Sequence, residues 1–328
     1  MASDETPRDS LVRDVTTPET GVHLLDVAPS QVILEGDSGM TASARGQWAT
    51  VLRRFLRSPQ AMIGVTVFLV MLIISYVYGL FNPNAYSAIS ATINSGPSAS
   101  HWFGTNTIGQ DILAQVLKGT LQDVQIALLV AVMAVVIGTI VGALAGFYGG
   151  KVDNLLMRFV DLILVIPVLV VLILLAHVVA QKADNWFWLA VIIGSLSWTY
   201  IARLVRADFL SLRERDFVEA SRALGASDFR IITRHMIPNA IGPIIVNATI
   251  TIAGAIVLEA TLSYLGLGIQ PPGISLGLLI EQGQNSATTQ WWLFVFPAAF
   301  LLLLILSVFF IGDGLQNALD PKKNRVRA

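Results

Sequence analysis

Uncharged apolar stretches recur along the chain at lengths that predict membrane-crossing helices. A bilayer core about 30 Å thick needs roughly 20 helical residues at a rise of about 1.5 Å each. Six stretches meet or approach this length, at residues 61–81, 126–147, 162–180, 186–202, 240–258 and 291–312. The pattern therefore predicts an all-α integral membrane protein with six transmembrane helices, of which the fourth is short and carries hydroxyl side chains.

The composition narrows the class further. Hydrophobic residues make up 54% of the 328 residues and charged residues 13%, about half the charged fraction of a soluble domain. A net charge of −1 provides no field that would attract nucleic acid, so we expect no nucleic-acid partner. The absence of cysteine excludes disulfide and thiol chemistry. The first twenty residues lack the apolar core of a signal peptide, so the first helix is expected to remain as an anchor.

The basic residues predict the topology. Of the 21 Lys and Arg residues, only Lys118 and Lys182 fall on one side of the six-helix arrangement. By the positive-inside rule, both termini and the loop 203–239 are cytoplasmic.

The remaining segments predict the domain organisation. Residues 1–47 mix acidic residues with Thr, Pro and Ser without periodicity, which is typical of a disordered cytoplasmic tail. The sequence does not indicate a function for this tail. Residues 48–60 have apolar side chains at helical spacing with arginines between them, which predicts an interfacial amphipathic segment that turns inward near Pro59. The transmembrane domain then covers 61–312, and 313–328 form a cytoplasmic C-terminal tail.

Two loops are expected on the outer side. Residues 82–121 contain an amphipathic pattern, and residues 267–290 contain an apolar piece too short to cross the membrane, which predicts a loop or half-helix. Each can contact an external partner or line a pathway, and the alternative is a connection packed on the bundle.

The polar segment 218–240 stands between two apolar stretches and carries its own helix signals. Asp216 is the predicted N-cap of a first helix, and Gly225 stands where a helix takes a left-handed C-cap. Ser227 can begin a second helix, which Pro238 is expected to end. The first helix has an apolar face made of Phe217, Ala220, Ala223 and Leu224. That face either packs on the chain's own spans or inserts into a groove of another subunit.

The same segment resembles the EAA loop of permease subunits in bacterial ABC importers. Glu219, Ala220 and Ser221 are followed by Gly225 six positions after the Glu, and by Pro238 thirteen positions after the Gly, as in that motif. Ser221 replaces the second Ala of the motif, a change between small side chains.

Several segments are similar to the dipeptide/oligopeptide branch of these permeases. They are "RHMIPN", "FGTNTIGQDILAQVLKG", "GFYGGKVDNLLMRFVDLILVIP", "EATLSYLGLGIQPP" and "FFIGDGLQNALDPK". The resemblance covers residues 48–328. Gln110 departs from it, because Arg is expected at that position.

The resemblance implies a type I ABC importer permease fold and a C-type permease that forms half of a translocation pathway in a bacterial inner membrane. The implied partners are a homologous second permease, one or two ABC ATPase chains, a solute-binding protein and membrane lipid. The implied cargo is a short peptide, with a nickel chelate, glutathione or haem as alternatives. In the EAA loop, Glu219, Ala220 and Gly225 are implied to be central to ATPase coupling, with Arg222 and Leu224 as contacts.

The chain itself is expected to carry no enzyme activity and no cofactor or metal, with ATP and Mg bound by the partner ATPase. In "AGFYGGKV", Val152 stands where a phosphate-binding loop needs Ser or Thr, and Ala145 stands where it needs Gly. An intramembrane enzyme would need a nucleophile or metal cluster, and the sequence has no HExxH motif. A secondary transporter, the remaining alternative, would show charges at the centres of its spans or paired broken helices.

Residues inside the spans are interpreted mainly as structural. Gly138, Gly142 and Gly146 recur every four residues on one face of the second span, where a neighbouring helix can approach closely. Arg158 and Asp161 are i, i+3 neighbours near the cytoplasmic interface and are expected to pair.

Two further residues have open roles. Pro167 is expected to kink the third span, with gating or simple packing as the consequence. Glu259 is placed near the outer end of the fifth span, where its carboxylate is expected to reach the interface, with a pathway-lining role as the alternative.

Overall fold

The computed structural model describes residues 44–82, 85–179 and 185–319, and these form a helical structure. Almost all of the expected tail 1–47 and the end of the tail 313–328 therefore lie outside the described residues. Within the described ranges no strand forms, and Thr105 and Asp111 make an isolated β-bridge. The helices are α1 (Ala44–Leu56), α2 (Pro59–Phe81), α3 (Ile112–Tyr148), α4 (Gly150–Val165), α5 (Val168–Val179), α6 (Asn185–Arg213), α7 (Asp216–Ala223), α8 (Asp228–Ile231), the π-helix η2 (Ile232–Met236), α9 (Ile237–Tyr264), α10 (Leu276–Gln284) and α11 (Trp292–Leu319).

Among the described residues, five helices are long and apolar enough to cross a membrane, and a sixth crossing is formed if the bent pair α4 and α5 counts as one span. The five are α2, α3, α6, α9 with the helical turns before it, and α11. The expected all-α membrane fold is thus confirmed.

The third span differs from the single apolar helix expected at 162–180. Helix α4 begins at Gly150, and the α4–α5 pair bends by 77° at the break before α5. Ile166 is extended at φ −80° and ψ 128°, the conformation favoured before proline, and Pro167 has no N–H to continue the helix. The break therefore lies at Pro167.

Several helices extend beyond the apolar stretches that predicted them. Helix α3 begins at Ile112 because Asp111 caps it, with the Ala114 N–H donating to Asp111 Oδ1 at 3.0 Å. Helix α6 continues through the first part of the expected loop 203–239, and α11 continues into the expected C-terminal tail. An apolar run sets only the minimum length of a membrane helix, because polar turns can continue it outside the bilayer.

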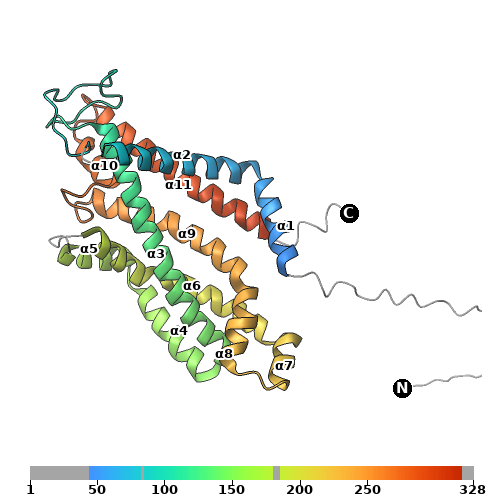
Figure 1. Ribbon diagram of the computed structural model, residues 1–328. Coiled ribbons are helices and arrows are strands. Elements are labelled where there is room, and N and C mark those ends of the chain that lie inside the picture. Colours follow the sequence, from blue (N-terminus) through green and yellow to red (C-terminus); the bar gives the residue numbers. More distant parts are fainter. Residues whose placement is uncertain (1–43, 83–84, 180–184, 320–328) are drawn as a thin grey trace, which may run out of the picture. The chain divides into compact units, whose positions relative to one another are not determined.

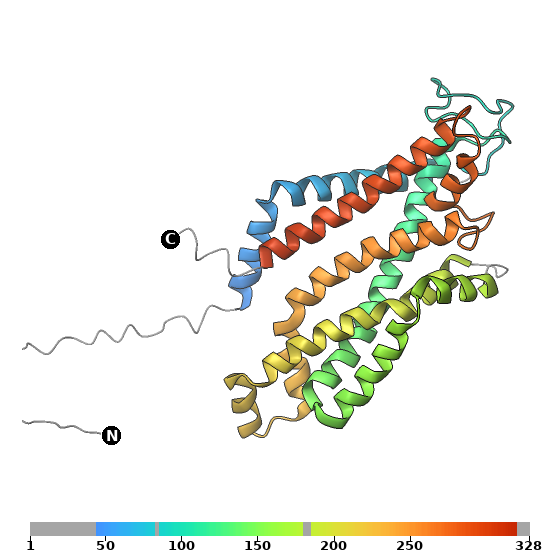
Figure 2. The same cartoon turned by 180° about the vertical axis from the view of Figure 1, so that it is seen from behind.

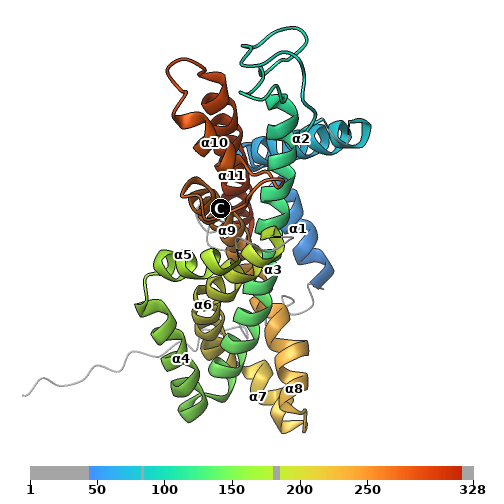
Figure 3. The same ribbon diagram turned by 90° about the vertical axis from the view of Figure 1, so that its left-hand side faces the viewer.

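The helices pack around two apolar clusters, and α3 with α6 is the most extensive helix pair. Helices α2 and α11 run side by side in both views of the bundle (Figures 1 and 2). At one end lie α7 and α8, and at the opposite end lies α10 (Figure 3). We call the second of these the α10 end.

The glycine repeat of the second span lies against α6. A Cβ built on Gly138 would come within 2.8 Å of the Trp198 carbonyl oxygen, and one on Gly142 within 2.8 Å of Val205 Cβ. A Cβ on Gly146 would meet Phe209 in the same way. The three glycines thus bring the α3 and α6 backbones close together.

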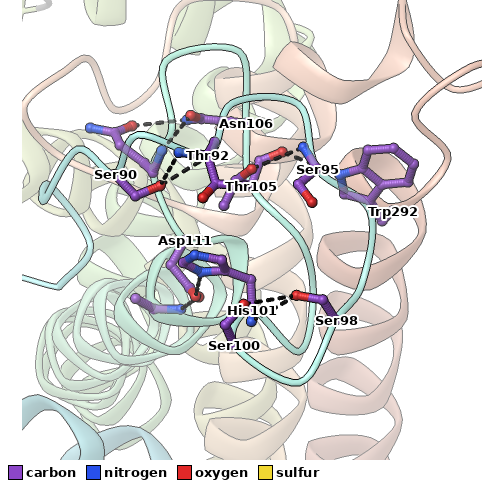
Figure 4. Close-up of polar contacts among 12 residues, drawn as sticks. Ser90, Thr92, Ser95, Ser98, Ser100, His101, Thr105, Asn106, Asp111 and Trp292 are labelled. Atoms are coloured by element: carbon purple, nitrogen blue, oxygen red, sulfur yellow. Dashed lines mark hydrogen bonds and ion pairs between the residues drawn. The ribbon is translucent and has the colours of Figure 1, made fainter.

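At the α10 end, the loop before α3 is held by polar contacts to two helices (Figure 4). His101 Nδ1 lies 2.8 Å from Asp111 Oδ2, and the Trp292 indole N–H of α11 donates to the Thr105 carbonyl at 3.3 Å. Phe103 also stacks on Phe296 of α11 with ring centroids 4.0 Å apart. This part of the loop is therefore fixed on the bundle, and the short apolar piece of 267–290 forms the nine-residue helix α10 beside it.

Candidate functional site

The polar segment between α6 and α9 forms two short helices joined by a tight turn, which we call the 216–236 hairpin. Helix α7 begins at Asp216, with Arg215 as its N-cap and no capping side chain. The expectation that Asp216 is the N-cap was therefore wrong by one residue. Asp216 and Glu219 instead lie in the first turn, where their charges suit the positive end of the helix dipole.

Gly225 shapes the turn between the two helices. Its φ is +78°, the left-handed conformation that glycine adopts without strain. The Gly225 N–H donates to the Arg222 carbonyl at 2.9 Å, and the Ala226 N–H donates to the Ser221 carbonyl at 3.1 Å. These two bonds make a Schellman motif, so the predicted C-cap is confirmed. Ser227 is the N-cap of α8, but its side chain accepts no capping hydrogen bond from a backbone N–H.

The hairpin presents one buried and one exposed side. Val218, Ile231 and Met236 are fully buried in the same cluster as α3 and α6. On the other side, the side chains of Leu224 and Phe229 are 88% and 77% exposed. One side therefore packs on the chain's own spans, while two large apolar side chains remain uncovered.

The other residues implied by the EAA resemblance divide between these sides. Glu219 and Ala220 are exposed, as Leu224 is. Ser221 is half-buried, and its hydroxyl donates to the Phe217 carbonyl at 2.7 Å. The Arg222 guanidinium lies over the Phe147 ring at 5.2 Å, so it ties α7 to the end of α3.

Pro238 does not end the second helix as expected. It occupies the first turn of α9, where the missing N–H of proline costs no intrahelical bond. The π-helical turn η2 connects α8 to α9, and the helical path runs from Asp228 to Tyr264. The hairpin is thus joined directly to a helix that crosses the bundle.

Two ion pairs join α4 to α6. The Arg206 guanidinium contacts both carboxylate oxygens of Asp153, with Nη2 to Oδ2 at 2.7 Å. Asp161 pairs with Arg203 of α6. The expected pairing of Asp161 with Arg158 was therefore wrong, because the tertiary partner on α6 takes the carboxylate that the i, i+3 neighbour was expected to hold.

Glu259 does not reach the interface. Its side chain is fully buried, and the Ser263 hydroxyl donates to Glu259 Oε1 at 2.6 Å. Sequence reasoning also missed Asp123 of α3, which is fully buried. A signal existed, because Asp123 follows Val116 and Thr120 at i+7 and i+3 on the buried face of α3.

Comparison with protein families agrees with this arrangement. Residues 134–325 match the model of the binding-protein-dependent transport system inner membrane component. Residues 46–97 match the N-terminal TM domain of oligopeptide transport permease C.

Individual relatives cover most of the chain. It is 39% identical to the oligopeptide transport system permease protein OppC of Mycobacterium tuberculosis (strain ATCC 25618 / H37Rv) over 84% of this chain and 95% of that one. It is 36% identical to OppC of Escherichia coli (strain K12) over 91% of this chain and 99% of that one.

A solved structure shares the fold. The inward-facing MetNI methionine ABC transporter matches 64% of this chain and 98% of its own compared chain, with a TM-score of 0.51 and 21% identity. The family model covers more than half of the chain, and the OppC relatives match over nearly their full lengths. The chain belongs to the family of binding-protein-dependent transport system inner membrane components.

Proposed function

We propose that this chain is a permease subunit of an ATP-driven importer of short peptides. The observation that carries the proposal is the 216–236 hairpin, which is packed on the bundle, continuous with α9 and uncovered at Leu224 and Phe229. Relatives named as oligopeptide permeases support the peptide cargo. The hairpin would receive the motion of an ATPase and pass it to α9 as a rigid unit.

The proposed partners follow from this role. An ABC ATPase subunit would cover the exposed side of the hairpin, and a homologous second permease would complete the pathway. An extracytoplasmic solute-binding protein would deliver cargo at the α10 end. ATP and Mg would be bound by the ATPase, so that this chain contributes no nucleotide or metal site. The chain would lie in the inner membrane with both termini and the hairpin in the cytoplasm, as its basic residues indicate.

The cargo can be tested with the assembled importer. The tagged chain would be purified from its native cell in mild detergent, its co-purifying subunits identified, and the complex placed in vesicles. We expect ATP-dependent uptake of short peptides and none of a nickel chelate, glutathione or haem. Uptake of one of these other solutes alone would overturn the peptide assignment. A chain that purifies alone and transports along an ion gradient without ATP would instead indicate a secondary transporter.

The contact with the ATPase predicts the effect of Leu224→Asp. The side chain is 88% exposed, so its replacement leaves the fold intact but places a charge in a groove that would be apolar. We expect the ATPase to bind at least tenfold more weakly, which corresponds to about 1.4 kcal/mol. The measurement is ATPase retention on the purified chain against ATPase concentration.

Asn154→Asp is the matched control, because it adds the same charge at an exposed position of α4 outside the hairpin. It should bind the ATPase as the wild type does. Equal retention by Leu224→Asp and wild type would contradict a contact at Leu224.

A further inference from the structure

Two carboxyl groups lie together inside the bundle although 136 positions separate them in the sequence. They belong to Asp123 of α3 and Glu259 of α9, and both side chains are fully buried. They meet at the start of α10, where the Leu276 N–H contacts Asp123 and the next residue, Gly277, packs directly against Ser263 of α9, one turn from Glu259. The proposed function assigns no role to either of them.

Each carboxyl group has one oxygen with a donor and one without. The Leu276 N–H at the start of α10 donates to Asp123 Oδ2 at 3.2 Å, and the Ser263 hydroxyl donates to Glu259 Oε1 at 2.6 Å, with the Ser275 hydroxyl as a further neighbour of Glu259. Within the described part of the chain, Asp123 Oδ1 and Glu259 Oε2 have no donor. Each of the two side chains therefore lacks a hydrogen-bond donor at one carboxylate oxygen.

No basic side chain among the described residues forms an ion pair with either carboxyl group. The ion pairs among the described residues join His101 to Asp111, Arg203 to Asp161 and Arg206 to Asp153, so none includes either carboxyl. Lys118, on the same helix as Asp123, is exposed and lies over the Tyr86 ring. Residues 44–82, 85–179 and 185–319 also contain no group of three His, Cys, Asp or Glu side chains that could hold a metal ion.

Two ionised carboxylates in contact repel each other, and burial removes the water that would weaken this repulsion. A proton on either group removes one charge and supplies the missing hydrogen bond. An O–H···O⁻ bond of this kind is among the stronger hydrogen bonds in proteins.

We infer that Asp123 and Glu259 form a proton-binding site, in which one proton is held between Asp123 Oδ1 and Glu259 Oε2. The proton joins α3 to α9, and the Leu276 N–H extends this link to the start of α10. It thereby fastens three elements at the α10 end, at the far end of the helix that leads from the 216–236 hairpin. A proton bound here is a resident part of the structure and is separate from the ATP-driven step.

The site can be tested by infrared spectroscopy of the purified full-length chain. A protonated carboxyl group has a C=O stretching band that ionised carboxylates lack, and the band shifts in D₂O and on ¹³C labelling of the carboxyl carbon. We expect such a band at neutral pH in the wild type, and we expect ¹³C labelling of Asp, of Glu or of both to shift it. The wild-type measurement needs no variant and no transport, so it is independent of the proposed function.

Variants then assign the band. In Asp123→Asn and in Glu259→Gln, the new amide donates an N–H to the remaining carboxylate, which no longer needs a proton, so the band should be lost. Asp208→Asn is the matched control, because Asp208 also has a buried carboxylate oxygen without a donor, and this variant should keep the band.

Three results would overturn the inference. They are no band in the wild type, a band that survives in both Asp123→Asn and Glu259→Gln, and loss of the band in Asp208→Asn alone. A wild type without the band whose thermal stability depends on Na⁺ or K⁺ would show that a cation fills the site in place of the proton.

Discussion

Replacing Gly225 by proline is expected to remove the ATPase from the purified complex while the membrane helices stay folded. Gly225 has a φ of +78°, and the proline ring holds φ near about −65°. Proline also lacks the N–H that donates to the Arg222 carbonyl. The Schellman turn cannot form, so α7 and α8 lose their relative orientation, and with it the arrangement of the exposed Leu224 and Phe229. The measurement is the amount of ATPase that co-purifies with the tagged variant and its helical circular dichroism.

Gly225→Asn is the control for Gly225→Pro, because it changes the side chain at position 225 but allows the Schellman turn to form. Asparagine tolerates the left-handed conformation better than other residues with a Cβ, and a Cβ at position 225 has no atom within 4 Å. This variant keeps the N–H and should retain the ATPase at close to the wild-type amount. Full retention by Gly225→Pro would contradict the role of the hairpin, whereas loss of helical signal in that variant would show that the turn is needed for folding.

The local features of the hairpin were predictable from the sequence because they depend on residues a few positions apart. Glycine adopts the left-handed conformation most easily, so Gly225 predicted the turn between the two short helices. The apolar runs predicted the membrane-spanning helices. The end of the second helix was predicted wrongly. Pro238 stands in the first turn of α9 because η2 carries the helix past the point where a proline was expected to stop it.

Contacts between distant segments could not be predicted from local patterns. The sequence places Arg158 next to Asp161 on a helix, but only the packing of α4 on α6 reveals Arg203 as the partner. Glu259 has the position of an interfacial residue, and its burial follows from α3 and α10, which bring Asp123 and Ser275 to it. Contacts between residues far apart in the sequence therefore cannot be predicted from local sequence patterns.

The glycine repeat of α3 is the exception, because its periodicity predicts a close helix contact without naming the partner. In the structure that partner is α6, and the close contact predicts that substitutions at Gly142 destabilise the chain. A Cβ at Gly142 would lie 2.8 Å from Val205 Cβ and still closer to the Ala202 carbonyl oxygen. Because the carbonyl belongs to the backbone of α6, a side chain at this position can be accommodated only if the two helices separate.

We therefore expect Gly142→Ala to destabilise the chain by roughly 1–3 kcal/mol, the usual cost of overpacking, and Gly142→Leu to prevent its accumulation. Gly254 is the matched control, since it also lies within a membrane helix but has no atom within 4 Å of a built Cβ. Gly254→Ala should leave the thermal midpoint in detergent unchanged or slightly raised, because alanine favours the helix. If Gly142→Ala and Gly254→Ala unfold at the same temperature, the α3–α6 contact does not require glycine. The expected difference between the two variants would instead show that backbone approach at Gly142 stabilises the bundle to which the hairpin is attached.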